Sequence, residues 1–210
     1  MKGDRAARRA RARRRVLGSF TRRVIRVGFR NTRVEDVCRE AGISNRDFYS
    51  WFGNKDGCYL AVFDAVGRKL LEGGRGAFDA APGPWETKLR AGLDSVACRL
   101  GTHPRVVRFL MEHEAVDGGA SAVWRLIAGA EQVYLTEELR HGSMGMPAAT
   151  LEAIVTSVVV YPMVGYVESG RLDRLPELVP WIVHYSTRHL FGPERAARLA
   201  PVATGRLGAG

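Results

Sequence analysis

The sequence is poor in cysteine, and its three cysteines, Cys38, Cys58 and Cys98, are widely separated. None belongs to a CxxC pair or to a cysteine and histidine spacing that binds zinc, which excludes a disulfide framework and a structural zinc site. Such cysteine usage is typical of a reduced, cytoplasmic protein. Cys38 falls on the apolar face of a predicted helix, and we interpret it as a small buried hydrophobic residue.

Long apolar runs are also missing. The longest, residues 153–167, contains Pro162 and is shorter than the roughly 20 residues that a membrane-spanning helix needs, so it predicts a buried helix and no membrane partner. The arginine-rich residues 1–15 lack the cleavable apolar region of a targeting peptide and are better interpreted as a basic arm.

Catalytic motifs are absent as well. There is no P-loop, GxSxG motif or dinucleotide fingerprint, and the GGRG run at residues 73–76 follows a predicted helix rather than a strand. His113 and Glu114 are adjacent, so on a helix they point about 100° apart, and no HExxH spacing follows. We therefore predict no enzyme, no metal site and no cofactor.

Positive charge is confined to one end of the chain. Residues 1–55 hold 16 lysines and arginines against 5 acids, whereas the remainder holds 16 against 17. A basic segment joined to a nearly neutral one predicts a reader of a polyanion attached to a second functional part.

The hydrophobic pattern predicts an all-α protein of about nine or ten helices, because no strand alternation is found. A first helix should begin near Ala12 and run to Val27, with Gly28 as its stop, and a helix from about residue 55 should end near Gly73. Residues 73–84 then form a loop. Further helices are expected at about 85–100, 104–117, 120–140, 148–169, 175–190 and 193–199.

The most informative segment is residues 32–55, TRVEDVCREAGISNRDFYSWFGNK, which predicts two short helices joined by a tight turn at Gly42. Thr32 is the expected N-cap of the first helix and Ser44 that of the second. Phe48 and Phe52 lie four residues apart and should face inward. The polar residues of the second helix then face solvent, as they do in a helix that reads a DNA groove.

These residues resemble the TetR-type (tetracycline-repressor-like) transcriptional regulators over about residues 12–65. The resemblance is carried by Gly28-Phe29 after the first helix, by Ala41-Gly42-Ile43-Ser44, by Phe48-Tyr49 and Phe52, and by Asn54-Lys55. It implies a three-helix DNA-binding head followed by a larger helical domain for effector binding and dimerisation. We expect a flexible arm at residues 1–15, the head at 16–55, the helical domain at 56–200 and a disordered tail at 201–210.

The contacts to DNA divide into two kinds. Asn45 and Arg46, at the start of the second motif helix, are the candidates for base contacts, with phosphate contact as the alternative for Arg46. The resemblance implies that Tyr49 donates to a phosphate and that Lys55 binds an anion at a helix start. The remaining predicted contacts are Thr32, Arg33, Ser44, Asp47, Ser50, Trp51, Arg13 and Arg14.

The chain departs from the family at Asp47, Ser50, Trp51 and Gly53. A carboxylate cannot donate to a phosphate, so Asp47 is expected either to accept from cytosine N4 or to hold an arginine. The arm arginines either enter the minor groove or screen phosphates.

The resemblance also implies a small-molecule cavity in the helical domain, for a hydrophobic or aromatic effector. Aromatic residues on apolar faces form core more often than ligand wall, so both interpretations stay open. The candidates are Phe63, Trp85, Phe109, His113, Trp124, Tyr134, Tyr161 and Tyr166. Two long apolar helices predict a homodimer interface that includes Val155, Val158, Val159, Trp181, Ile182 and Tyr185.

The leading hypothesis is a dimeric repressor that a small molecule releases from a pseudo-palindromic DNA operator. The alternative is a nonspecific basic protein that associates with nucleic acid through its arginine arm.

Overall fold

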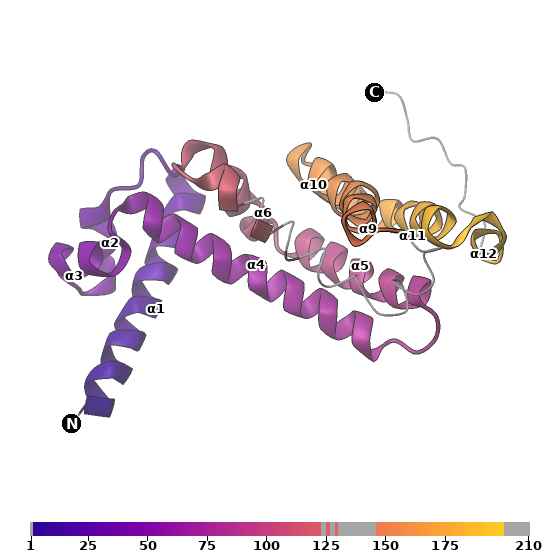
Figure 1. Ribbon diagram of the computed structural model, residues 1–210. Coiled ribbons are helices and arrows are strands. Elements are labelled where there is room, and N and C mark those ends of the chain that lie inside the picture. The colour runs from indigo at the N-terminus through magenta and orange to yellow at the C-terminus, as the bar shows by residue number, and fades with distance from the viewer. Residues whose placement is uncertain (1, 123–124, 127–128, 130–145, 200–210) are drawn as a thin grey trace. The chain divides into compact units, whose positions relative to one another are not determined.

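The computed structural model describes residues 2–122, 125–126, 129 and 146–199 (Figure 1). Every regular element among these residues is a helix, which confirms the all-α prediction. The chain divides into two compact units. We call residues 1–69 with 103–126 the head unit, and residues 70–102 with 127–210 the tail unit.

The head unit begins with three helices, α1 (Lys2–Val27), α2 (Val34–Ala41) and α3 (Asn45–Phe52). The apolar face of α2 is buried as predicted, and α2 packs on both α1 and α3. Gly42 ends α2 in the left-handed conformation, with φ 65° and ψ 48°, so the predicted turn between α2 and α3 is confirmed.

Helix α1 starts at Lys2 and not near Ala12, so the start predicted for the first helix was wrong. The segment consists mostly of arginine and alanine, which are among the best helix formers. It is also held from the side, because Arg9 and Arg13 lie over aromatic rings of α3. The predicted end at Val27 is confirmed.

Thr32 does not cap α2. The N-cap position belongs to Arg33, which makes no side-chain capping bond. Thr32 is instead 2 % exposed, and its hydroxyl donates to the Gly28 carbonyl at 2.8 Å. The threonine therefore closes the turn after α1 from inside, a role that its position before α2 does not reveal.

Helix α4 (Lys55–Ala80) belongs to both units and runs through Gly73 and Gly74, so the end predicted for it was wrong. In the tail unit, Phe78 is buried, which favours continuation of the helix. A Cβ on Gly73 would lie 2.6 Å from Nε of Arg99 on α5 (Trp85–Thr102), so the glycine permits close packing of these helices. The connection shrinks to residues 81–84.

The head unit also contains α6 (Pro104–Met111) and the 3₁₀ helix η1 (Glu112–Ala115). Its core contains a chain of aromatic rings. Phe29 meets Phe20 and Tyr59 edge to face, and Tyr59 stacks on Phe109 with ring centroids 4.6 Å apart. The Tyr59 hydroxyl donates to the Phe109 carbonyl at 2.8 Å, which joins α4 to α6.

The tail unit contains α5, α9 (Ala148–Val155), the π-helical turn η2 (Thr156–Val160), α10 (Tyr161–Glu168), the 3₁₀ helix η3 (Leu172–Arg174), α11 (Leu175–Phe191) and α12 (Pro193–Ala197). The helix predicted over 148–169 thus contains a π turn. Pro162, which has no backbone N–H to donate, lies two residues after the end of that turn. Most of the predicted helix at 120–140 and of the break that follows it lies outside the described residues.

Two kinds of feature are absent from the described residues. None of their helices combines the length and apolar character needed to cross a membrane. No group of three or more histidine, cysteine, aspartate and glutamate side chains among them is arranged to hold a metal ion.

Candidate nucleic-acid interface

The predicted reading helix, α3, is capped and anchored by its own sequence. The Ser44 hydroxyl accepts from the Asp47 backbone N–H at 3.1 Å, which confirms Ser44 as the N-cap. Phe48 is fully buried and its ring packs against Phe52, with centroids 5.2 Å apart. One face of α3 is thereby fixed to the core, and the opposite face is left to solvent.

That exposed face carries the residues predicted to contact DNA. Asn45, Arg46, Asp47, Tyr49 and Ser50 are all exposed. Tyr49 keeps 47 % of its surface, unusual for an aromatic residue beside a core. An exposed row of amide, guanidinium and hydroxyl groups can bond to base edges and to phosphate oxygens.

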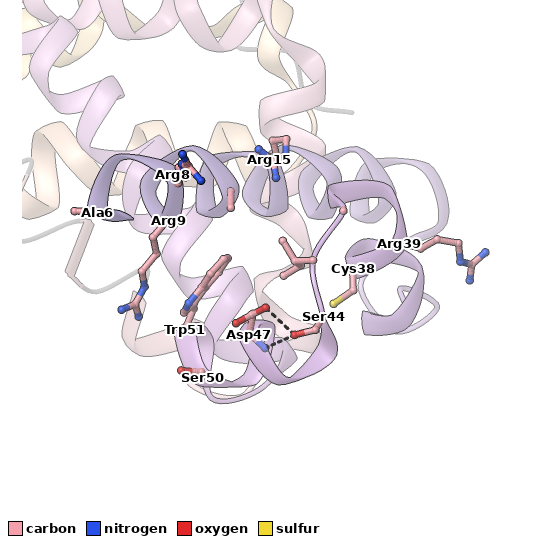
Figure 2. A pocket seen from close by; sticks show the side chains of 13 residues that line it. Ala6, Arg8, Arg9, Arg15, Cys38, Arg39, Ser44, Asp47, Ser50 and Trp51 are labelled. Atoms are coloured by element: carbon pink, nitrogen blue, oxygen red, sulfur yellow. Dashed lines mark hydrogen bonds between the residues drawn. The ribbon is translucent and has the colours of Figure 1, made fainter. Parts of the chain in front are cut away.

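Asp47 is engaged locally. The Ser44 hydroxyl donates to the Asp47 carboxylate at 2.7 Å, while the same oxygen accepts from the Asp47 N–H (Figure 2). Ser44 thus caps the helix start through its hydroxyl oxygen and gives its hydroxyl hydrogen to Asp47. In the structure, Asp47 is bonded to Ser44. The sequence predicted cytosine N4 or an arginine as its partner.

The side chain predicted to bind phosphate at the start of α4 is bonded to a loop in this structure, and its phosphate contact stays a prediction. The Lys55 ammonium donates to the Phe29 carbonyl at 3.0 Å and to the Arg30 carbonyl at 3.4 Å. It also lies 4.3 Å from the centroid of the Phe29 ring. These contacts make Lys55 a brace for the turn between α1 and α2.

Glu112 is a positioning residue that the sequence did not reveal. Its carboxylate accepts from the Phe29 backbone N–H at 2.9 Å, across 83 positions of sequence. Phe29 is thus bonded to Lys55 through its carbonyl and to Glu112 through its N–H. Because no local pattern links η1 to this turn, only the folded head unit shows the contact.

Thr32 and Arg33 differ in their exposure to solvent and so in their access to DNA. The Thr32 side chain is buried, as described above, and does not reach the surface, whereas Arg33 is exposed at the start of α2. Arg33 occupies the N-cap position of α2, where its contact with a phosphate stays a prediction.

The helical arm brings a second row of arginines alongside α3. The guanidinium of Arg9 lies 5.8 Å from the centroid of a Trp51 ring, and that of Arg13 lies 5.1 Å from the Phe52 ring. Both distances fit a cation resting over an aromatic face. Arg9 and Arg13 are one turn apart, a spacing that would have indicated the contact if the arm had been interpreted as a helix.

An open groove of about 980 Å³ lies between this part of α1 and the helix-turn-helix. Figure 2 shows Arg9 extending from α1 beside the indole of Trp51, with Asp47 and Ser44 farther along the same side. Arg8, Arg9 and Arg15 line the groove together with Trp51. On another side of α1, Arg14 lines a smaller hollow of about 400 Å³.

Ion pairs fix α2 on α1 beneath this surface. Arg23, with only 16 % of its side chain exposed, contacts Asp36 and Glu40 at 3.0 Å each. The Ser19 hydroxyl, which donates to Glu40, and the nearby Arg23 hold the pKa of the Glu40 carboxyl below its ordinary value. Arg15 adds a bond from Nε to the Ala41 carbonyl at 3.0 Å.

The buried titratable groups of the head unit are inert by environment. Burial raises the pKa of the Cys38 thiol, with smaller contributions from Glu35 and Asp47, and burial also raises the pKa of Cys58 and of Tyr59. Cys38 is 3 % exposed, which confirms its interpretation as a small buried residue. Thiols held protonated in the core do not act as nucleophiles.

The residues predicted to line an effector cavity have different surroundings. Phe63 and Phe109 are buried in the aromatic core around Tyr59, and the His113 ring nitrogen Nδ1 lies 2.9 Å from the Leu110 carbonyl. In the tail unit, Trp85 is fully buried and packs on Phe191.

The last four cavity candidates lie elsewhere. Tyr161 is 42 % exposed, whereas Tyr166 is partly buried. Trp124 and Tyr134 lie outside the described residues.

The predicted dimer interface is corrected in part. Val155, Val159 and Ile182 are at most 2 % exposed, because α9, η2 and α11 pack on one another within the tail unit. These three residues belong to the chain's own core. Val158 and Trp181 are partly exposed, and Tyr185 is 52 % exposed, so these three remain available to a partner.

Parts of the chain are similar to known sequences. Residues 21–62 match the family model described as bacterial regulatory proteins, tetR family. A segment of 80 residues is 28 % identical to the HTH-type transcriptional regulator EthR of Mycolicibacterium smegmatis. That segment covers 38 % of this chain and 37 % of the relative. The match therefore spans little more than a third of the relative's length.

Solved structures resemble a larger part of the chain. The fatty acid degradation regulator FadR from Bacillus halodurans is 16 % identical with a TM-score of 0.58, over 82 % of this chain and 96 % of that one. A TetR family transcription regulator from Marinobacter aquaeolei VT8 is 17 % identical with a TM-score of 0.59, over 88 % and 98 %. The TetR family repressor AlkX from Dietzia is 20 % identical with a TM-score of 0.54, over 84 % and 95 %. At these identities the likeness establishes the fold.

Proposed function

Because this chain belongs, through its N-terminal helix-turn-helix, to the TetR family of bacterial regulatory proteins, we propose that it is a sequence-specific, homodimeric repressor of transcription. The observation that carries the proposal is the exposed face of α3, where Asn45 and Arg46 stand on the first turn of a helix anchored by Phe48. Asparagine can bond adenine and arginine can bond guanine through two hydrogen bonds each. A repressor of transcription acts at the chromosome, so we place it in the cytoplasm.

Dimerisation is proposed from the tail unit. Tyr161 and Tyr185 are exposed aromatic residues, with Val158 and Trp181 partly exposed. A twofold dimer presents two copies of α3 to successive major grooves, about 34–36 Å apart, and so selects a pseudo-palindromic operator.

Release by a small molecule follows from the continuity of α4. This helix begins in the head unit, where Lys55 braces the turn after α1, and it ends in the tail unit. A ligand that favours another conformation of the tail unit can thereby alter the spacing of the two α3 helices. To empty a nearly full operator it must prefer that conformation by about 10⁴-fold.

We propose a small hydrophobic effector. FadR is described as a regulator of fatty acid degradation, and AlkX as a repressor implicated in biodegradation of n-alkanes. Both descriptions concern apolar substrates and support a ligand of that class for a chain of the same fold.

The test is selection of bound fragments from random duplex DNA by the purified protein, at about 150 mM salt to suppress nonspecific binding. We expect enrichment of a pseudo-palindrome. Asn45→Ala and Arg46→Ala should each lose about 1–3 kcal/mol of discrimination at one position of each half-site. Arg105→Ala, which removes an exposed arginine from α6, serves as the control and should keep the wild-type motif.

A second function is supported by the arginines of α1, which line hollows on two of its sides. A nonspecific nucleic-acid-binding protein would use them without base recognition. Selection that enriches no motif, with affinity falling uniformly as salt rises, would favour this alternative and contradict the operator proposal.

A further inference from the structure

The groove between α1 and α3 has a cationic wall and an aromatic wall. Arg8, Arg9 and Arg15 line it from α1, and Trp51 lines it from α3. Asp47 is the acidic residue among its lining side chains, and its carboxylate is already bonded by Ser44. Arg39 of α2, which is paired with Asp36, also lines the groove, so four guanidinium groups face one carboxylate and the groove is complementary to an anion.

Arg9 is prepared to bind such an anion. The central carbon of its guanidinium lies 5.8 Å from the centroid of a Trp51 ring, within the range of a cation–π contact, so the indole restricts where the group can lie. The N–H donors of a guanidinium lie in its plane and point away from that face, in the fork geometry that fits phosphate oxygens. The contact with Trp51 therefore holds the guanidinium beside the groove and involves its charge rather than its N–H donors.

The shape of the arm selects among the phosphates of DNA. An α-helix with its side chains is about 10–12 Å wide, whereas the minor groove of B-DNA is about 6 Å wide. Because α1 is helical from Lys2, its backbone cannot lie in the minor groove as an extended arm would. The sugar-phosphate backbone beside the groove read by α3 remains accessible to them.

We propose that the groove between α1 and α3 binds the phosphodiester backbone of duplex DNA next to the half-site, with Arg9 as the phosphate ligand and Trp51 as its positioning residue. This inference rests on the proposed function in one respect, namely that α3 faces duplex DNA. It adds a binding site that extends the contacted DNA beyond the bases read by Asn45 and Arg46.

The test measures affinity against salt on a random-sequence duplex of about 40 base pairs, which requires no operator. Arg9→Ala removes one phosphate ligand, so it should lower the slope of log K against log salt by about 0.9, which is a factor of about 3.5 between 50 and 200 mM salt. Trp51→Ala keeps the charge of Arg9 but removes its support, so affinity should fall by less than for Arg9→Ala. Arg9→Lys should retain the slope and bind more weakly, because lysine keeps the charge without the planar fork.

Arg105→Ala again provides the matched control, and circular dichroism should confirm that each variant keeps the wild-type helix content. An Arg9→Ala slope equal to that of Arg105→Ala would overturn the proposal. So would an equal Arg9→Ala effect on single-stranded DNA of the same length, because the groove would then bind any polyphosphate chain.

The two proposals fail separately. A selection without a motif, together with the expected Arg9→Ala slope, would remove sequence specificity and keep the groove. A normal operator with an unchanged Arg9→Ala slope would remove the groove alone.

Discussion

The head unit and the tail unit hold their charged groups in different ways. In the head unit, Arg23 is shared between Asp36 and Glu40, and Phe29 is bonded on both sides, so the contacts are several and distributed. In the tail unit, Arg195 on α12 forms an ion pair with Glu86 on α5, across 109 positions of sequence. The difference teaches that single substitutions should be tolerated better at the ion pairs of the head unit than at this one pair of the tail unit.

Glu86→Gln should have the largest effect. Glu86 is 6 % exposed and receives three hydrogen bonds from Arg195, the shortest at 2.7 Å, while the Arg195 guanidinium lies 4.0 Å from the centroid of the Phe191 ring. Neutralising the nearly buried carboxylate removes the negative charge that pairs with Arg195 and should cost about 3 kcal/mol of unfolding free energy. Urea denaturation measures this value.

The control is Glu177→Gln, which breaks the exposed pair of Glu177 with Arg174 in the same unit. We expect a loss below about 1 kcal/mol, as is typical of surface ion pairs. Equal losses for Glu86→Gln and Glu177→Gln would contradict the large contribution assigned to the Glu86–Arg195 pair of the tail unit.

Two glycines of α4 sharpen the comparison within one helix. A Cβ on Gly57, in the head unit, would lie 2.1 Å from the Phe52 carbonyl oxygen, so Gly57→Ala must displace backbone and should cost about 1–3 kcal/mol. Gly76, in the tail unit, has no atom within 4 Å of such a Cβ, so Gly76→Ala should stabilise by about 0.5–1 kcal/mol. Thermal unfolding of both variants measures the two signs, and a stabilising Gly57→Ala would contradict the described junction of α3 and α4.

The smallest expected effect is a pH dependence in the head unit. Because the folded pKa of Glu40 lies below the ordinary value near 4.3, its contacts stabilise the fold above that pH and lose this contribution as pH falls through the folded pKa. The carboxyl is 34 % exposed, so solvent screening should limit the contribution to less than about 1 kcal/mol. Urea denaturation between about pH 3 and 6 should show a weaker pH dependence for Glu40→Gln than for the wild type, and identical curves would refute the role given to Glu40.

Local chemistry explains which features the sequence predicts. Ser44 and Gly42 act through bonds and dihedral angles within three residues, so their roles in the helix-turn-helix follow from the sequence alone. The end of α4 does not, because Gly73 is tolerated only through packing against α5. Glu112 and the brace role of Lys55 are set by contacts across 83 and 26 positions, for which one sequence carries no local signal.

In the candidate site, too, some features follow from local spacing and others depend on contacts between distant parts of the chain. The outward face of α3 follows from the spacing of Phe48 and Phe52, so its exposed residues are predictable. The contact of Arg9 with Trp51 depends on how far α1 extends, and the buried Val155 and Ile182 depend on which helices pack on them. Periodicity predicts that a face is apolar but does not predict whether the chain itself or a partner covers it.

The early start of α1 has a consequence for the entropy of association. Fixing the backbone of one residue costs about 1–2 kcal/mol, so an arm that ordered only on DNA would lose much of the attraction of its arginines to that cost. With the helix present from Lys2, the backbone of the arm is ordered before the partner arrives. The free energy of each arginine contact is then available for holding DNA, and the arm acts as a preorganised part of the binding surface.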